Sequence, residues 1–397
     1  MEILVHDAPR DARPDLRSLP QEHLAALVAS LGERPFRTRQ LLRWLHQKGA
    51  ASLDEMSDLP RPFREALGRA TTLTTLSVAT EQRSVDGTIK WTFRTHDGKL
   101  VESVYMPEED RKTLCLSSQV GCAVGCTFCM TGTMGLARNL TAGEIVDQVH
   151  RANRRIVELG LVPEQGWGPD EPRSAGRGPG PRRAQGLRPL TNLVFMGMGE
   201  PLANYKNLKI ALELLQHEDG PNFSHRHITV STSGLVPVIR KLGEETPVKL
   251  AVSLNATTDA QRDALMPINK RYPLGELLRA CREFPMRHGR RITFEYVLLG
   301  GVNDTEEDAA RLVRLLRGIP AKVNLIPYNP NPGLGFAAPA PERVVAFQEL
   351  LAARNLTAVV RKNRGRDIAA ACGQLAAEGG PGDPRRTPGL TAAPVAR

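Results

Sequence analysis

Four of the six cysteines lie within fifteen residues of one another, and their spacing indicates a site that binds a metal cluster. Three of them, Cys122, Cys126 and Cys129, are spaced CxxxCxxC on a stretch that contains glycine. Three thiolates can hold three irons of a 4Fe–4S cube and leave the fourth iron without a protein ligand. A small molecule can chelate this open iron, so the cysteine stretch is the first candidate for an active site.

Zinc and disulfides are the alternative uses of such cysteines. Structural zinc needs a fourth Cys or His, usually from a second pair, and no such pair follows this loop. Cys115 is available, but six residues separate it from Cys122. A disulfide framework is disfavoured because the chain is long, has no signal sequence and has its cysteines bunched together. We therefore interpret the loop as an iron–sulfur site.

Composition places the chain among globular proteins. Its 397 residues, 41% hydrophobic and 24% charged, are sufficient for two or three domains. No apolar run reaches the length of a membrane span, and the first residues lack the pattern of a signal peptide, so we expect a cytoplasmic protein. A net charge of +10 is compatible with a nucleic-acid partner, although basicity alone is a weak indication.

The first part of the chain is predicted to be helical and then to change to strands. Apolar residues recur at helical spacing from residue 19 to 73, with further helices over 38–49 and 61–67. Hairpins follow over 80–106, where Asp-Gly pairs separate β-rich runs. The helical part carries four basic residues that either contact phosphates or form a solvated face: Arg37, Arg39, Arg43 and Lys48.

From residue 112 onward, strands and helices alternate, which predicts a parallel sheet curled into a partial barrel. Strands are expected over 113–116, 192–196, 227–232, 248–254, 292–298 and 323–326. Helices are expected over 141–158, 203–217, 235–243, 260–265, 273–284 and 304–317. Six such units give an α/β fold in which functional residues gather at the carboxyl ends of the strands.

Polar residues follow several of these strands and are expected to meet at one rim. The second strand ends in Gly197-Met-Gly-Glu200, in which glycine permits a close approach and the carboxylate can accept hydrogen bonds from an amine or a ribose. The candidate cofactor-binding residues at this rim are Gly199, Glu200, Ser231, Ser253, Leu254, Asn255 and Asn329.

Cys372 differs from an ordinary packing cysteine. It stands beside Gly373, after a run with four basic side chains in six residues, so its thiol is expected to be partly ionised and reactive. Cys281, on a predicted helix, is expected to be inert. Two low-complexity stretches, 161–190 and 377–397, are rich in glycine, proline and arginine and are expected to be disordered.

These motifs together resemble the RlmN family, the dual-specificity radical S-adenosylmethionine methyltransferases of 23S ribosomal RNA and transfer RNA. The resemblance covers roughly residues 20–375 apart from the insertion. The matching stretches are 101–107, 118–132, 197–201, 231–234, 324–330 and 361–375. It implies an open (β/α)6 barrel, a 4Fe–4S cluster on Cys122, Cys126 and Cys129, and two S-adenosylmethionine molecules per turnover.

The resemblance also implies the roles of three further residues. Cys372 takes a methyl group from one S-adenosylmethionine, and a radical made from the second converts that methyl to a methylene radical, which adds to carbon 2 of adenine. Glu102 removes a proton from the adduct. Cys115 then attacks the sulfur of Cys372, which releases methylated RNA and leaves a disulfide bond.

Two alternatives remain at this point. A sister family modifies carbon 8 of the same adenine with the same cysteine pair, although the helical domain, with Phe36, Trp44 and Lys48, is more similar to the carbon-2 enzymes. The other alternative is an RNA-binding protein with a structural zinc ion.

The expected organisation follows from these patterns and from the resemblance. The expected domains are an RNA-binding helical domain (1–79), a β extension (80–111), the barrel (112–345), a segment with the catalytic cysteine (346–376) and a tail (377–397). The expected partners are 23S rRNA, tRNA and an electron donor such as flavodoxin or ferredoxin. We expect a monomer that does not contact a membrane.

Overall fold

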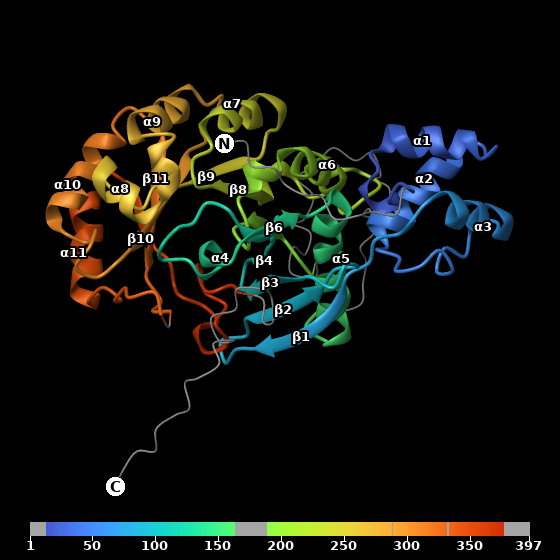
Figure 1. The fold of residues 1–397 in the computed structure, drawn as a ribbon, viewed down its shortest axis with the longest axis horizontal. Helices are drawn as coiled ribbons and strands as arrows, with labels where there is room; N and C mark the ends of the chain where they lie inside the picture. Colours follow the sequence, from blue (N-terminus) through green and yellow to red (C-terminus); the bar gives the residue numbers. More distant parts are fainter. Residues whose placement is uncertain (1–12, 163–188, 288, 332, 377–397) are drawn as a thin grey trace, which may run out of the picture.

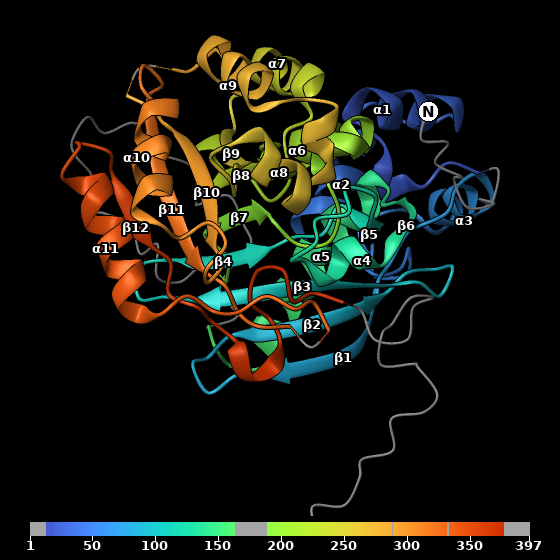
Figure 2. The ribbon, with the colours of Figure 1, turned by 60° about the vertical axis from the view of Figure 1, so that its left-hand side comes forward.

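The computed structural model describes residues 13–162, 189–287, 289–331 and 333–376 (Figure 1). They form a ten-stranded sheet in the order β1-β2-β3-β4-β7-β8-β9-β10-β11-β12. The strands from β4 to β12 pair in parallel and curl into a partial barrel with helices on the outside, as Figure 2 shows. The predicted α/β partial barrel is confirmed, and β12 adds a seventh parallel strand that the alternation of elements did not predict.

The observed strand ends agree with the expected ones to within two residues. The parallel strands are β4 (Lys112–Cys115), β7 (Asn192–Phe195), β8 (Ile228–Thr232), β9 (Lys249–Ser253), β10 (Ile292–Leu298), β11 (Ala321–Pro327) and β12 (Ala358–Val360). The surrounding helices are α5 (Ala142–Glu158), α6 (Tyr205–Gln216), α7 (Val236–Glu245), α8 (Asp259–Leu265), α9 (Leu274–Glu283), α10 (Glu306–Leu315) and α11 (Pro341–Ala352). Their apolar faces and the strands form one large core, as expected for a parallel sheet covered by helices.

The β extension continues the barrel sheet. β1 (Ser77–Arg83), β2 (Ile89–Arg94) and β3 (Leu100–Pro107) are antiparallel, and β3 pairs with β4. The predicted Asp-Gly turns are present, with Gly87 and Gly98 at φ of 83° and 76°, in the left-handed region that favours glycine. The first strand of the barrel, β4, is thus paired on both sides, with β3 and with β7. Within the described ranges, no helix is both long and apolar enough to cross a membrane.

The cysteine loop is carried by a small hairpin that the sequence did not predict. β5 (Gln119–Cys122) and β6 (Gly135–Asn139) pair with each other, and α4 (Met130–Thr133) lies between them. Gly121 makes this pairing possible because a Cβ there would lie 1.9 Å from the Gly135 carbonyl oxygen. Cys122 is the last residue of β5, and its pairing with Gly135 fixes its position.

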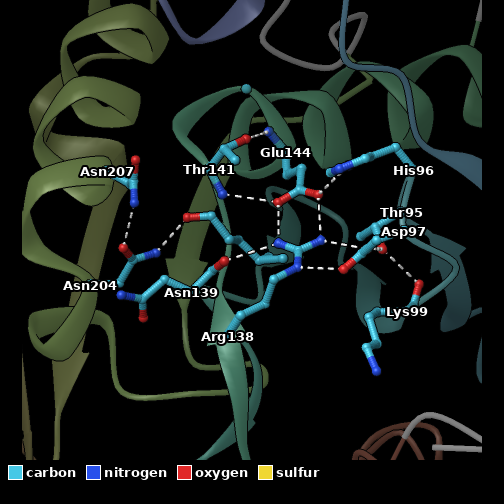
Figure 3. A network of polar contacts seen from close by, with 12 residues as sticks. Thr95, His96, Asp97, Lys99, Arg138, Asn139, Thr141, Glu144, Asn204 and Asn207 are labelled. Atoms are coloured by element: carbon cyan, nitrogen blue, oxygen red, sulfur yellow. Dashed lines mark hydrogen bonds and ion pairs between the residues drawn. The ribbon is translucent and has the colours of Figure 1, made fainter. Parts of the chain in front are cut away.

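A buried ionic network fixes this hairpin to the barrel (Figure 3). Arg138 on β6 donates two hydrogen bonds of 2.8 Å to the Glu144 carboxylate and two of 2.8 Å to Asp97. Glu144 also completes a capping box with Thr141 at the start of α5. His96, Asp97 and Glu144 lie close enough to suggest a metal site, but the Arg138 guanidinium already provides the positive charge.

The N-terminal helices form a separate small core. α1 (Gln21–Ser30), α2 (Phe36–Leu42) and α3 (Arg61–Ala70) enclose apolar side chains that include Leu24, Leu41 and Phe63. The predicted helix over 38–49 continues α2 through a π-helical turn at Arg43–Gln47. Arg17 is fully buried, donates to the Leu45 carbonyl over 2.8 Å and lies 3.4 Å from Asp147 on α5. This arginine connects the helical domain to the barrel.

After β12, the chain crosses to the β extension. The Gly365 amide donates to the Asp86 carboxylate over 3.0 Å, Ser84 donates to Asp367 over 2.6 Å, and the Ala376 amide donates to Glu102 over 2.9 Å. Residues 361–376 therefore connect the last parallel strand to the hairpins beside β4.

Two expected disordered stretches fall mostly outside the described residues, namely 163–188 of the insertion and 377–397 of the tail. At the two ends of the expected insertion, Val162 and Leu190 are 5% and 2% exposed and belong to the barrel core.

We predict that Arg138→Met lowers the free energy of unfolding by about 3–5 kcal/mol, because it leaves the fully buried Glu144 without its partner. The matched control is Arg61→Met, which breaks a pair whose side chains are 83% and 51% exposed. This control is expected to change stability by less than about 1 kcal/mol. Urea denaturation of both variants measures the difference, and equal losses would contradict the structural role of the network.

Candidate active site

The three cysteines of the CxxxCxxC motif gather at one cavity at the carboxyl ends of the barrel strands. Cys122 comes from the end of β5, and Cys126 and Cys129 come from the turn before α4. The cavity is also lined by Met196, Gly197, Gly199 and Glu200 after β7, by Ser231, Ser253, Asn255 and Glu295 from the next strands, and by Cys372. Residues from distant parts of the sequence thus meet at the expected rim.

The chemistry of the three thiols fits a bound metal cluster. Burial raises the pKa of Cys122 to about 12. Burial also raises the pKa of Cys126, and the neighbouring Cys129 and Cys122 raise it further. Three buried thiols that disfavour one another's ionisation need a strong positive charge to become thiolates, and an iron–sulfur core supplies it. Three of the four thiols that line the cavity belong to this loop, and three such donors fit a cube that keeps one open iron.

The loop that carries Cys372 packs directly against the cysteine loop. The Met130 amide donates to the Gly373 carbonyl over 2.8 Å, and the Thr131 hydroxyl donates to the Leu375 carbonyl over 2.6 Å. Asn331 donates to the same Gly373 carbonyl over 3.3 Å. Cys372 is thus placed on the wall of the cavity that the three cluster cysteines line.

A guanidinium group that the sequence analysis did not single out contacts Cys372. Arg361 Nη1 lies 2.9 Å from Cys372 Sγ and donates to it. Burial raises the pKa of the Cys372 thiol, and the positive charge of Arg361 opposes that shift. Cys115 is 5% exposed, and its pKa is raised to about 12 by burial and then by the charge of Cys372. All six cysteines are free thiols, so the disulfide bond that the resemblance implied is absent from this structure.

The glycine-rich turn after β7 packs closely against another segment of the protein. A Cβ on Gly199, at φ 96°, would lie 2.5 Å from the Gln119 side chain, so glycine is required here for packing against this segment, and the residue also lines the cavity. Glu200 is 4% exposed and is oriented by amides, since Ser233 N donates to it over 2.7 Å and Leu202 N over 3.0 Å. Burial raises the pKa of this carboxyl, and these amides counter the shift.

Glu295 on β10 is a second wall residue that the sequence analysis missed. Its carboxylate accepts a hydrogen bond of 2.6 Å from the Ser231 hydroxyl and one of 3.4 Å from the Ser253 hydroxyl. Both serines were expected at the rim, and the carboxylate fixes their orientation. Asn255, at φ 55°, accepts from the Val297 amide over 2.8 Å, so its side chain is also held in place.

Four expected site residues lie behind this wall, outside the set that lines the cavity, namely Glu102, Cys115, Leu254 and Asn329. Leu254 is fully buried, and Asn329 accepts a hydrogen bond of 2.9 Å from Asn363. Glu102 is 1% exposed, lies 3.4 Å from Lys90 and accepts the Ala376 amide. Glu102 is therefore tied to the segment that carries Cys372.

Arg262 holds the strand ends together beneath the site. It is fully buried and donates to the Ser233 carbonyl over 2.6 Å, the Leu254 carbonyl over 3.1 Å and Asn269 over 3.0 Å. Burial lowers its pKa to about 10. The only sequence signal was an arginine in a short helix, which does not distinguish a buried position from a surface one.

Comparison with known proteins agrees with this geometry. Residues 14–73 match the family model described as the ribosomal RNA large subunit methyltransferase N-terminal domain, and residues 182–313 match the radical SAM superfamily. A solved structure titled as a radical SAM methyltransferase from Sphaerobacter thermophilus superposes with a TM-score of 0.82 at 47% identity. The match covers 92% of the present chain and 100% of the Sphaerobacter thermophilus chain.

The partial barrel with its three-cysteine cavity defines a radical S-adenosylmethionine enzyme. A protein named dual-specificity RNA methyltransferase RlmN from Anaeromyxobacter sp. (strain Fw109-5) is 77% identical over 98% of this chain and 99% of its own length. RlmN 2 of Myxococcus xanthus is 56% identical over 94% of this chain and 93% of its own. The chain belongs to the RlmN family of dual-specificity RNA methyltransferases. It uses a 4Fe–4S cluster and S-adenosylmethionine, as this family does.

We predict that replacing Cys122, Cys126 or Cys129 with Ala removes the cluster, because each supplies one of only three thiolates. Iron content and visible absorbance after anaerobic reconstitution measure this loss. Cys281→Ala, which removes a buried thiol on α9 instead, is the control and is expected to keep full iron. Full iron in any of the three loop variants would contradict the assignment.

Proposed function

We propose that this protein methylates carbon 2 of adenine in 23S ribosomal RNA and in transfer RNA, with Cys372 as the carrier of the methyl group. The observation that carries the proposal is the docking of the Cys372 loop on the cysteine loop. This contact supports the proposal because it holds the sulfur of Cys372 beside the candidate cluster site. An ordinary S-adenosylmethionine methyltransferase needs no such sulfur.

The target carbon explains why a radical is required. Carbon 2 of adenine is electron-poor and has no acidic proton, so it does not attack a sulfonium methyl group as a nucleophile. A carbon radical does add to it. When bound, the 4Fe–4S cluster and S-adenosylmethionine supply a 5′-deoxyadenosyl radical that removes a hydrogen atom from a methyl group. The residues proposed to hold this cofactor are Gly199, Glu200, Ser231, Ser253, Leu254, Asn255 and Asn329.

Cys372 performs the first step as a nucleophile. Its thiolate attacks the methyl carbon of one S-adenosylmethionine, and S-adenosylhomocysteine leaves. The guanidinium of Arg361, 2.9 Å from the sulfur, favours the ionised form of Cys372. After hydrogen removal, the methylene radical on the same sulfur adds to carbon 2, and the adduct radical gives up one electron, which the oxidised 4Fe–4S cluster, when bound, would accept. Glu102 accepts the proton from that carbon, and its contact with the Ala376 amide keeps it near the Cys372 loop.

Cys115 completes the reaction. Its thiolate attacks the sulfur of Cys372, and the bond between that sulfur and the methylene carbon breaks. The carbon keeps the electron pair and takes a proton to become a methyl group, and a transient disulfide remains. Burial protects the Cys115 thiol before this step, since its pKa of about 12 keeps it protonated at neutral pH. An external dithiol must then reduce the pair before another turnover.

The helical domain, residues 1–79, is proposed to bind RNA. Phe36 is 51% exposed with the Arg37 guanidinium 4.8 Å from its ring centre, and Lys48 lies 3.4 Å from that of Trp44. Aromatic and cationic groups of this kind at the surface suit unpaired bases and phosphates. Three arginines of this domain are also engaged within the protein, since Arg37 lies 3.6 Å from Glu33, and Arg39 and Arg43 each lie 2.9 Å from Asp219.

The remaining expectations are proposals of the same kind. We propose a cytoplasmic monomer that receives electrons from a flavodoxin or ferredoxin. The division into 1–79, 80–111, 112–345, 346–376 and 377–397 is likewise proposed. The high identity to relatives named RlmN supports carbon 2 over carbon 8, and membership of the radical enzyme class removes the structural-zinc alternative.

Two single-cysteine variants test the assigned roles. Cys115→Ala is expected to pass through methylation and radical addition and then stop, because no thiol remains to release the product. The purified protein should carry covalently bound RNA, visible as a nuclease-sensitive shift on a denaturing gel. Cys372→Ala should bind the cluster and form no adduct.

The double variant is the control and is expected to carry no RNA, because the adduct needs Cys372. RNA attached to Cys372→Ala, or to neither single variant, would overturn the two roles.

A further inference from the structure

Glu295 on β10 is a buried carboxylate that has no cationic partner among the described residues. It is 6% exposed, and its Oε2 accepts hydrogen bonds from the hydroxyls of Ser231 at 2.6 Å and Ser253 at 3.4 Å. Within the part of the chain that the structure describes, no hydrogen bond reaches Oε1, and neither oxygen forms an ion pair. Because Glu295 lines the active-site cavity, Oε1 is available to a molecule bound there.

Two other buried glutamates near the site are compensated within the protein. Glu102 lies 3.4 Å from the Lys90 ammonium group. Glu200 also lines the cavity, but each of its oxygens accepts a hydrogen bond from a backbone amide. A buried carboxylate normally needs a cation or several hydrogen-bond donors to offset its desolvation. Two hydroxyl groups on one oxygen leave the charge of Glu295 only partly compensated, which favours a cationic ligand beside it.

The charge of Glu295 acts on the part of the cavity where Cys372 lies. Burial raises the pKa of the Cys372 thiol, the charge of Arg361 opposes this shift, and the charge of Glu295 adds to it. The charge of Glu200 acts elsewhere, since burial raises the pKa of Cys122 to about 12 and the charge of Glu200 contributes to that shift. One carboxylate of the cavity therefore lies toward the cluster cysteines and the other toward Cys372.

The chemistry of methyl transfer brings a cation to the Cys372 side. S-adenosylmethionine carries a positive charge on its sulfur, and the methyl carbon on that sulfur is the atom that Cys372 attacks in the proposed reaction. Reacting atoms must approach to roughly 3–3.5 Å before such a step. The cationic sulfur is one bond farther from Cys372, and so it lies in the region that the charge of Glu295 reaches.

We propose that Glu295 is the counter-ion of the sulfonium group of S-adenosylmethionine and gives the cavity a preference for this molecule over S-adenosylhomocysteine. The two molecules share their amino-acid, ribose and adenine parts, and they differ in the methyl group and in the charge that it gives the sulfur. A carboxylate with an unpaired oxygen attracts the charged sulfur and does not attract the neutral one. This inference rests on the proposed role of Cys372 as the methyl carrier.

Such a preference has a use in a reaction that takes two S-adenosylmethionine molecules per turnover. The first methyl transfer leaves S-adenosylhomocysteine in the cavity, and a second S-adenosylmethionine must replace it. The sulfur loses its positive charge in the transfer itself, so its attraction to Glu295 ends when the product forms. Glu295 then acts as a specificity-determining residue that favours exchange of product for cofactor, in addition to orienting Ser231 and Ser253.

Equilibrium binding of the two molecules tests the proposal. Isothermal titration uses the full-length, cluster-loaded protein without reductant, in a Cys372→Ala background, so that the cofactor is neither cleaved nor demethylated. This protein should bind S-adenosylmethionine at least about tenfold more tightly than S-adenosylhomocysteine. Adding Glu295→Gln should weaken S-adenosylmethionine binding by at least about tenfold and change S-adenosylhomocysteine binding by less than about threefold. The amide side chain keeps an oxygen that accepts from the Ser231 hydroxyl.

Two further variants in the same background separate charge from other effects. Ser231→Ala removes the 2.6 Å hydrogen bond and leaves the carboxylate, so it should lower the affinity for both molecules by similar factors. Glu276→Gln makes the same chemical change at an exposed position on α9 and should alter neither affinity. Iron content and circular dichroism show whether each variant is loaded and folded.

Three results would overturn the proposal. The first is equal affinity of the Cys372→Ala protein for the two molecules, a measurement that does not depend on the folding of any Glu295 variant. The second is an equal loss of both affinities in Glu295→Gln, which would show that Glu295 only orients the serines. The third is unchanged S-adenosylmethionine binding in that variant. None of these results bears on the covalent RNA adduct, which tests the roles of Cys115 and Cys372 separately.

Discussion

The contact between the Cys372 loop and the cysteine loop is the interaction on which the site depends. The Met130 amide and the Thr131 hydroxyl each donate a hydrogen bond across this contact. Thr131 and its acceptor, the Leu375 carbonyl, are 244 residues apart in the sequence. Each side is fixed independently, by Arg138 beneath the cysteine hairpin and by Glu102 beneath residue 376. A rigid approach of this kind suits the proposed role of Cys372, because a short-lived methylene radical would have to form and react without leaving its sulfur.

An incomplete barrel makes room for this arrangement. A closed barrel has eight strands, whereas this sheet has seven parallel ones, and irregular chain over 361–376 lies between the last strand and the hairpins. Gly365 and Ala369, at φ of 62° and 49°, adopt the left-handed conformation that bends this chain. A regular strand at that position would direct alternate side chains inward and would not bring Cys372 onto the cysteine loop. The catalytic sulfur therefore depends on irregular backbone held by specific hydrogen bonds.

Local patterns in the sequence predicted the barrel strands well, because apolar runs and the glycine turns that end them are local signals. They also located the cysteines and the serines at strand ends. Glu295, Arg262 and Arg361 were missed because a single charged residue in a strand or short helix resembles a surface residue until its partners are known. The hairpin of β5 and β6 was missed for a related reason, since its pairing depends on contact between Gly121 and Gly135 across the cysteine loop. Gly199 also packs against Gln119, eighty residues earlier, which is a constraint that the local sequence does not reveal.

The most direct test of the account follows the hydrogen atoms of the transferred methyl group. The purified protein is supplied with S-adenosylmethionine whose methyl group carries three deuterium atoms, and the RNA product is digested and analysed by mass spectrometry. If Cys372 carries the methyl and loses one hydrogen atom to the radical, the new group on carbon 2 should contain two deuterium atoms and one ordinary hydrogen. A product that retains all three deuterium atoms would indicate direct displacement and would contradict the account.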